Sequence, residues 1–153
     1  MKVIIGADSA GYVLKDPLVR HLTEQGIDVQ DIGIFYNEAG ELTDPAQRDY
    51  PVVAQQVARP VAAGEYDFGI ILCGTGIGVG MTANKIRGIR AATVVTAFEA
   101  KFTRLHNDAN VLCMGGRVIA PETACELADI FLSTGFEGGR HQRRVDMMNA
   151  LDD

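Results

Sequence analysis

Short apolar runs alternate with longer amphipathic stretches along the chain. Runs of four to seven residues that are rich in valine and isoleucine are typical of buried strands, and they predict strands at residues 2–6, 27–32, 68–72, 89–95 and 110–114. The stretches between them place apolar side chains three or four positions apart, as Leu14, Leu18 and Leu22 do. This spacing predicts helices over residues 10–25, 51–63, 77–86, 97–106, 121–133 and 139–150.

The order of these elements predicts an α/β fold. Parallel strands need a crossover connection, which a helix between successive strands supplies. We therefore expect a doubly wound, Rossmann-like, five-stranded parallel sheet with helices on both faces. No repeat, linker or low-complexity segment divides the sequence, so residues 1–153 are expected to form a single domain. Residues 33–48 are polar and rich in turn formers, which indicates a loop, and Pro60 falls in the last turn of its helix, where proline disturbs the boundary.

In a sheet of this kind, ligands bind beyond the carboxyl ends of the strands, where the strand order reverses. The segments that follow the predicted strands are therefore the first places to look for a site, and they are Asp8-Ser9, Cys73–Gly76, Thr96 and Gly115–Arg117. If the strand at 68–72 lies beside the strand at 2–6, Asp8 and Cys73 flank the same crevice.

Composition and charge exclude several classes of protein. The net charge of −6 lacks the basic footprint of a nucleic-acid-binding protein. No apolar run approaches the roughly 20 residues that span a bilayer, and the first residues do not have the pattern of a signal peptide. Three widely spaced cysteines form neither a disulfide framework nor a zinc pattern. We expect a soluble, cytoplasmic protein that binds neither nucleic acid nor membranes.

The segment from Cys73 to Gly80 places four glycines between a buried strand and a helix. Backbone N–H groups in such a loop can converge on an anion. The segment is not a dinucleotide fingerprint, because Val79 stands where a third glycine is required, and it lacks the Gly-Lys-Ser/Thr of a Walker A loop. A small anionic ligand fits the loop better. A tight turn that needs glycine for its geometry alone is the alternative.

Cys73 ends the strand that precedes this loop. The positive end of the following helix favours the thiolate form, so Cys73 is a candidate nucleophile or base. The alternative is a buried structural thiol. We assign that role to Cys113, inside a strand, and to Cys125, on the apolar face of a helix.

The carboxyl-terminal part of the chain supplies basic and titratable groups. Arg140 and Arg144 are four positions apart, hence on one helical face, and two guanidinium groups suit a phosphate. Arg117 is a third candidate for the same anion. His106, at the end of a helix, titrates near neutrality and could move protons on a sugar oxygen. The alternative for the arginines is a solvated charged helix face, and the alternative for His106 is a histidine that caps its helix. Tyr50, which opens a helix, could reach a ligand.

These segments together resemble the ribose-5-phosphate isomerase B family, which also contains the subunits of galactose-6-phosphate isomerase. The resemblance runs from residue 1 to about 148, in order and without a large gap. It rests on Gly6–Gly11 with Leu14-Lys15, Asp49–Pro51, Cys73–Gly78, Ala83–Lys85 with Gly88–Arg90, His106–Val111, Gly116-Arg117 and Glu137–His141. The collinearity of the motifs makes it specific.

The resemblance implies aldose–ketose isomerisation of a phosphorylated sugar through an enediolate, without metal or cofactor. It makes Cys73 the base that moves a proton between C2 and C1, and Thr75 part of the hole that holds the enediolate oxygen. His106 then serves as the ring-opening acid and base. The substrate-binding positions that match are Asp8, Ser9, Tyr50, Gly74, Gly76, Gly78, Asn107, Arg117, Arg140, His141 and Arg144. The family also implies a homodimer, or a tetramer, with active sites at the subunit interface.

One position departs from the family pattern. The family commonly has histidine after the first aspartate, and this chain has Ser9, which is shorter and carries no charge. Some relatives that act on other sugar phosphates also have serine there, but they tend to lack the His106–Asp108 pattern. Ribose 5-phosphate is therefore the expected substrate. A hexose 6-phosphate, a tetrose phosphate or a non-catalytic phosphosugar-binding subunit are the alternatives. A nucleotide-binding module is the most distant one.

Overall fold

The computed structural model describes residues 1–152. Its strands are β1 (Lys2–Ala7), β2 (Asp28–Asp31), β3 (Phe68–Cys73), β4 (Ala91–Thr93) and β5 (Val111–Gly115). Its helices are α1 (Tyr12–Glu24), α2 (Tyr50–Ala62), α3 (Ile77–Ala83), α4 (Ala97–Asn107), α5 (Pro121–Ser133) and α6 (Arg140–Asn149), with a 3-10 turn η1 (Pro45–Arg48). Each helix and strand that the hydrophobic pattern predicts is present, and the differences concern where the elements end.

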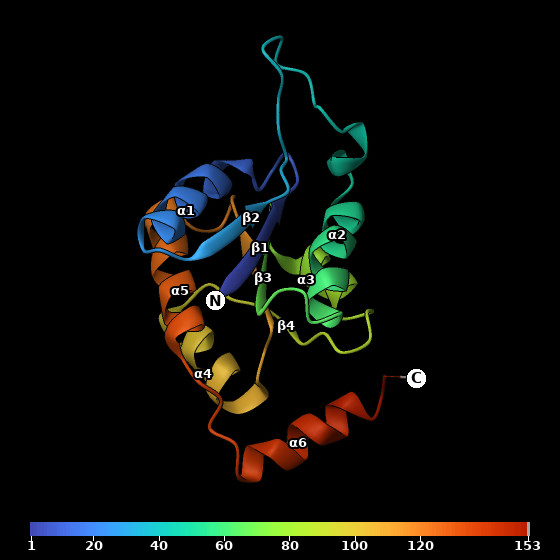
Figure 1. Cartoon of the computed structure of the whole chain (residues 1–153), viewed down its shortest axis with the longest axis vertical. Helices are drawn as coiled ribbons and strands as arrows, with labels where there is room; N and C mark the ends of the chain where they lie inside the picture. The colour runs from blue at the N-terminus through green and yellow to red at the C-terminus, as the bar shows by residue number, and fades with distance from the viewer. Residues whose placement is uncertain (153) are drawn as a thin grey trace.

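The strands form one parallel sheet in the order β2-β1-β3-β5-β4, which confirms the predicted doubly wound architecture. Figure 1 shows α1, α4 and α5 on one side of the sheet and α2 and α3 on the other. The central strand β3 pairs with β1 and with β5, so that the ends of these three strands meet at one edge. Asp8 and Cys73 therefore follow neighbouring strands and flank the same edge of the sheet, as expected if these two strands lie side by side.

Two apolar layers hold the sheet between the helices. One layer packs α1, α4 and α5 on the sheet, with Leu14, Leu18 and Phe131 fully buried. The other packs α2 and α3, with Val57 and Val79 fully buried. Strands covered on both faces must be apolar on both, which explains the continuous apolar runs from which they were predicted.

Strand β4 is much shorter than the predicted strand at 89–95. Just before the strand, the Asn110 side chain accepts from the backbone N–H of Arg90 at 2.8 Å. At the other end, the Glu99 carboxylate accepts from the N–H groups of Val95 and Thr96 as part of a capping box for α4. Side chains thus take up the backbone groups that would otherwise extend the strand. Among residues 1–152, no helix combines the length and the hydrophobicity that crossing a membrane requires.

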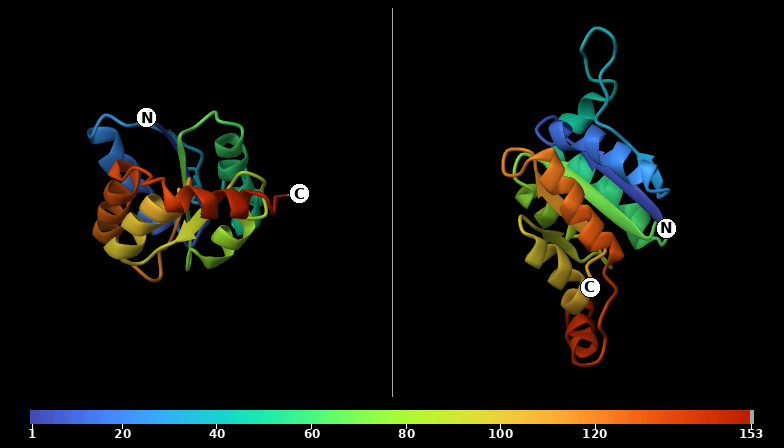
Figure 2. Two further views of the ribbon diagram at one scale, coloured as in Figure 1. Left: turned by 90° about the horizontal axis from the view of Figure 1, so that it is seen from below. Right: turned by 90° about the vertical axis from the view of Figure 1, so that its left-hand side faces the viewer.

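Residues 33–48 form an arm that projects from the body of the molecule (Figures 1 and 2). The predicted loop contains a single antiparallel bridge between Tyr36 and Leu42 and ends in η1. The Asn37 side chain closes the tip by accepting from the N–H groups of Ala39 and Glu41. Helix α6 lies at the opposite end of the molecule (Figure 1).

Candidate active site

The loop after β3 is held from several directions at once. Cys73 is 5% exposed, and its Sγ accepts from the backbone N–H of Gly76 at 3.1 Å. The backbone of the neighbouring strand closes the loop from the side, because Gly116 donates to the Cys73 carbonyl at 2.8 Å and Arg117 to the Gly74 carbonyl at 3.0 Å. The thiol is therefore fixed at the mouth of the loop, in contact with an amide that stabilises negative charge on sulfur.

At two positions in and beside this loop, a side chain would strain the backbone or collide with it. Gly76 has φ +78°, a left-handed conformation that side chains disfavour. Gly115 ends β5 so close to the loop that a Cβ there would lie 2.6 Å from the backbone of Thr75. The hydroxyl of Thr93 donates to the Gly76 carbonyl at 2.9 Å and fixes the loop from β4 as well.

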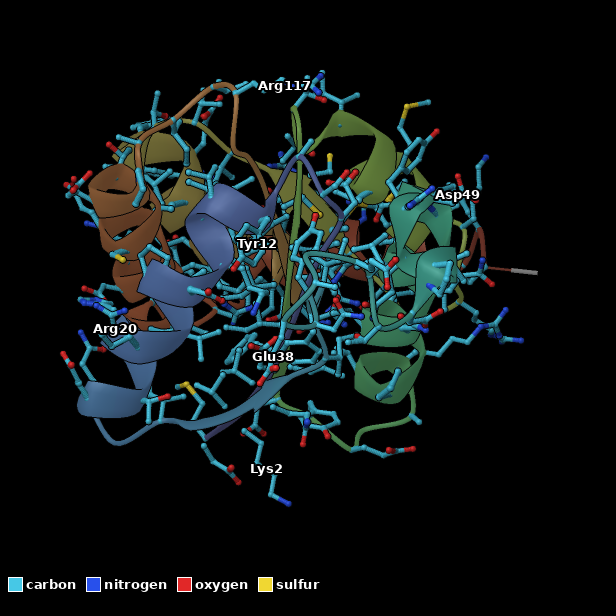
Figure 3. The ribbon with its side chains drawn as sticks, turned by 90° about the horizontal axis from the view of Figure 1, so that it is seen from above. Lys2, Tyr12, Arg20, Glu38, Asp49 and Arg117 are labelled. Carbon is cyan, nitrogen blue, oxygen red and sulfur yellow. The ribbon has the colours of Figure 1, made fainter. Side chains whose placement is uncertain are left out.

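Three of the predicted binding residues surround the loop. Tyr50 lies over Gly78, where a Cβ would come within 2.8 Å of its ring. Arg117 extends beside Gly74 and is exposed (Figure 3). Thr75 is exposed, and its hydroxyl accepts from the N–H of Ile77 at 3.3 Å. The loop thus presents a hydroxyl, a phenol and a guanidinium around the thiol.

Asp8 and Ser9 have different surroundings. Asp8 is buried, and its Oδ1 accepts from the N–H groups of Ala10 and Gly11, both at 2.9 Å, so the carboxylate shapes the turn after β1. Ser9 is exposed and lines a pocket of about 610 Å³ whose other walls come from the arm. These walls are Tyr36, Gly40, Glu41, Leu42, Pro45 and Arg48. The arm therefore adds a surface at Ser9, the position that departs from the pattern of the family the sequence resembles.

The remaining predicted residues gather at the carboxyl end of α4 and the start of α6. The rings of His106 and His141 stack in parallel, with centroids 4.0 Å apart and an angle of 8°. Glu137 Oε2 lies 3.6 Å from Nε2 of His106 and 3.8 Å from Nε2 of His141. Burial lowers the pKa of His141, the adjacent His106 lowers it further, and the charge of Glu137 opposes both effects. Arg140 Nε donates to Nε2 of His141 at 3.3 Å.

A pocket of about 430 Å³ opens between β4, α4 and α6. Its polar lining includes the predicted residues His106, Asn107, His141 and Arg144. Its apolar lining includes Phe98 and Phe102, which stack at 4.2 Å on the same helical face that carries His106. The pocket combines basic groups, which suit an anion, with an apolar aromatic wall.

Within one chain, the predicted residues thus form two groups. The thiol group comprises Cys73 to Gly78, Tyr50 and Arg117 beside the ends of β3 and β5, with Asp8 and Ser9 after β1. The histidine group comprises His106, Asn107, Arg140, His141 and Arg144 on α4 and α6. Thr93 touches both, because it lines the histidine pocket and donates to Gly76. Arg117, expected to hold the same anion as Arg140 and Arg144, lies with the thiol group.

Among the described residues 1–152, His106, Glu137 and His141 are the three side chains close enough to share a metal ion, with their donor atoms within 4.8 Å of one another. The other cysteines fit their structural role. Burial raises the pKa of the Cys113 thiol, and nearby Cys73 raises it further.

Several residues of the two pockets were not identified from the sequence. Phe98, Phe102 and His106 follow one another at a spacing of four, a signal that would have predicted an aromatic face on the helix. Thr93 and Glu137 carry no such signal, because each acts through a partner that is distant in the sequence.

Comparison with known proteins confirms the family that the sequence resembles, along nearly the whole chain. Residues 3–148 match the family described as Ribose/Galactose Isomerase. The chain is 43% identical to Ribose-5-phosphate isomerase B of Escherichia coli, over 99% of this chain and 96% of that protein. It is 40% identical to D-erythrulose-4-phosphate isomerase of Pectobacterium atrosepticum, over 95% of this chain and 91% of that protein. The structure of ribose-5-phosphate isomerase B from Mycoplasma genitalium with bound ribulose-5-phosphate superposes with a TM-score of 0.87 at 40% identity, covering 97% of this chain and 94% of that one.

Proposed function

Because this chain belongs to the ribose/galactose isomerase family, we propose that it interconverts ribose 5-phosphate and ribulose 5-phosphate. One observation of the site carries the proposal. The Cys73 thiol lies at the end of the central strand, against the N–H of Gly76 and at the mouth of a loop that offers further amides. Isomerisation needs both a base and donors for the oxygen on which charge develops, and this loop offers both within three residues.

In the proposed reaction, the Cys73 thiolate removes the proton from C2 of the open-chain aldose. The electron pair moves to form the C1–C2 double bond, and the negative charge develops on the oxygen at C1. The hydroxyl of Thr75 and the loop amides of Gly74 and Gly78 stabilise that oxygen, while the N–H of Gly76 stays on the thiol. The hydroxyl proton on O2 passes to the oxygen at C1, which becomes the C1 hydroxyl. The electron pair left on O2 forms the C2 carbonyl while C1 takes the proton back from the thiol, which gives the ketose and restores the thiolate.

The histidine group serves the two ends of the sugar. His106 moves the protons that open the aldose ring, and Asn107 binds a sugar hydroxyl. Arg140, His141 and Arg144 bind the phosphate, whose binding energy orients the reacting carbons without taking part in the chemistry. Arg117, Tyr50, Asp8 and Ser9 complete the contacts at the thiol loop.

We further infer a homodimer in which the thiol group of one copy meets the histidine group of the other. Apolar side chains around the two groups support this arrangement, since Ile77, Met81 and Phe98 are between 57% and 68% exposed. Strand β4 lies at the edge of the sheet nearby. Each copy of residues 1–153 would then act as one isomerase domain in the cytoplasm, and a tetramer would pair two such dimers.

The proposal is tested by incubating the protein with ribose 5-phosphate in D₂O and following deuterium at C1 and C2 by NMR. We expect deuterium in the ketose formed, and a loss of roughly 10³-fold in the rate for Cys73→Ala, since a general acid–base contributes about 10²–10⁴. Cys125→Ala, which removes a structural thiol on α5, is the matched control. Full activity of Cys73→Ala would reject this thiol as the base.

A second substrate class is favoured by the pocket at Ser9. The arm lines this pocket with an acidic residue, a basic residue and a tyrosine, which are Glu41, Arg48 and Tyr36. A relative of 40% identity is named for a tetrose phosphate. Erythrose 4-phosphate, allose 6-phosphate and galactose 6-phosphate therefore belong in the same experiment. Exchange with one of them but not with ribose 5-phosphate would keep the mechanism and reassign the substrate.

A further inference from the structure

Glu137 has no role in the mechanism above, yet the fold directs its carboxylate at the two histidines. Its backbone N–H donates to the carbonyl of Leu105, at 3.0 Å, which ties it to the residue before His106. Gly138 and Gly139 then turn the chain with positive φ angles of 69° and 56°, so that α6 begins at once. Glu137 is thereby held between the end of α4 and the start of α6.

The two histidines differ in what they can give to this carboxylate. Nε2 of His141 accepts a hydrogen bond from Arg140, so in this arrangement that nitrogen bears no proton. Burial also lowers the pKa of His141, in keeping with a neutral ring. A carboxylate only accepts hydrogen bonds, so Nε2 of His106 is the imidazole nitrogen that can donate to Glu137.

The ring of His106 is further restrained by its neighbours. His141 stacks on it with centroids 4.0 Å apart, and Phe102 meets it edge-on at 4.9 Å. Nε2 of His106 is 3.6 Å from Glu137 Oε2, slightly longer than a hydrogen bond. Contacts of this kind commonly shorten when substrate closes the site.

We propose that Glu137 is the positioning residue of the ring-opening step: it accepts from Nε2–H of His106 and leaves Nδ1 as the nitrogen that exchanges protons with the sugar. The inference rests on the proposed function. In ring opening, the C1–O4 bond breaks and its electron pair goes to O4, which takes a proton. The hydroxyl on C1 loses its proton as the C1 carbonyl forms, so the number of protons on His106 is restored at the end.

This role gives a signature that a general structural role does not. Ribose 5-phosphate is predominantly a furanose and must be opened before C2 can react. Ribulose 5-phosphate has its C5 oxygen phosphorylated, cannot close to a five-membered ring, and reaches the enediolate without ring opening. Loss of Glu137 should therefore slow turnover of the aldose and leave proton exchange at C1 of the bound ketose intact.

The experiment compares the wild-type chain with Glu137→Gln, which removes the charge and keeps the size of the side chain. kcat/KM is measured for ribose 5-phosphate, and the rate of deuterium entry at C1 of ribulose 5-phosphate is measured in D₂O by NMR. We expect at least about a 10-fold loss in the first, a fraction of the roughly 10²–10⁴ that general acid–base catalysis contributes, and less than a twofold change in the second. Glu126→Gln, an exposed glutamate on α5, is the matched control.

Equal losses in both measurements would overturn the inference, because Glu137 would then serve the whole site. An unchanged kcat/KM would overturn it as well. A wild-type chain that neither turns over ribose 5-phosphate nor exchanges C1 of the ketose would instead reject the proposed function, so the two failures are distinguishable.

Discussion

The thiol group and the histidine group are built in opposite ways. Cys73 ends a central strand, is almost fully buried, and is surrounded by backbone hydrogen bonds from its own loop and from β5. The histidine group lies at the periphery, where α6 begins, and only His141 and Val145 of that helix are buried. Figure 2 shows α6 outside the two layers that cover the sheet.

The difference follows the role proposed for each group. Proton transfer between two carbons depends on distances of a few tenths of an ångström, so its base benefits from the stiffest part of the fold. A phosphate can be held by long, exposed guanidinium side chains whose attraction falls off slowly with distance. The comparison teaches that the proton transfer between carbons is placed in the buried, hydrogen-bonded part of the fold, and that phosphate binding and ring opening are assigned to the exposed rim.

The largest change in activity is expected when the loop of the thiol group is displaced by a substitution at Gly115, a residue of β5 behind that loop. Gly115→Ala would place a methyl group 2.6 Å from the backbone of Thr75 and push the loop away from β5. We expect a loss of stability of about 1–3 kcal/mol from overpacking, and a fall in kcat of roughly 100-fold from misplacing the base. Urea denaturation and steady-state kinetics measure the two effects.

Gly135→Ala serves as the control for this variant, because a Cβ at Gly135 meets nothing within 4 Å. If Gly115→Ala had wild-type kcat, the loop would be more tolerant than its contacts indicate, and the contrast between the two groups would be wrong.

A smaller and different effect is expected on the peripheral side. Arg144→Ala removes one charged hydrogen-bond donor to the phosphate, and such bonds contribute about 1.5–3 kcal/mol. KM should therefore rise roughly 10- to 100-fold, with a lesser change in kcat and with unchanged stability. Arg143→Ala removes a neighbouring exposed arginine on the same helix and is the control. A fall in kcat as large as that of Gly115→Ala would erase the distinction.

The smallest effect concerns the pH dependence of stability. Burial, and then the adjacent His106, lower the pKa of His141 below its ordinary value of about 6.5. As the pH falls through about 6.5, the unfolded chain takes up a proton at this position before the folded chain does, so stability decreases. The decrease ends once the folded state is also protonated. Urea midpoints between about pH 7 and 5 should show a shallower slope for His141→Gln, and identical slopes would contradict the assignment.

Hydrophobic periodicity was sufficient for the architecture and for much of the thiol group. Buried apolar strands separated by helices predicted the parallel sheet, and the strand order then placed Asp8 beside Cys73. Periodicity could not predict the length of β4, because the side chains of Asn110 and Glu99 bind the backbone groups on either side of it.

The division of the site residues into two groups could not be predicted either. Motifs along a sequence carry no distances, so Arg117 and Arg144 looked equally suited to one phosphate. Glu137 was part of a motif but received no role for the same reason, since its place beside the histidines depends on a backbone contact with Leu105, which is distant in the sequence.

The separation of the two groups also has an evolutionary side. In the proposed homodimer, each active site draws its base from one copy of the chain and its phosphate anchor from the other. After a gene duplication, one copy could lose its thiol loop and the other its α6 arginines, and a mixed pair would still contain one whole site. Such a lineage would arrive at an enzyme made of two unlike, mutually dependent subunits, without any new interface having to arise.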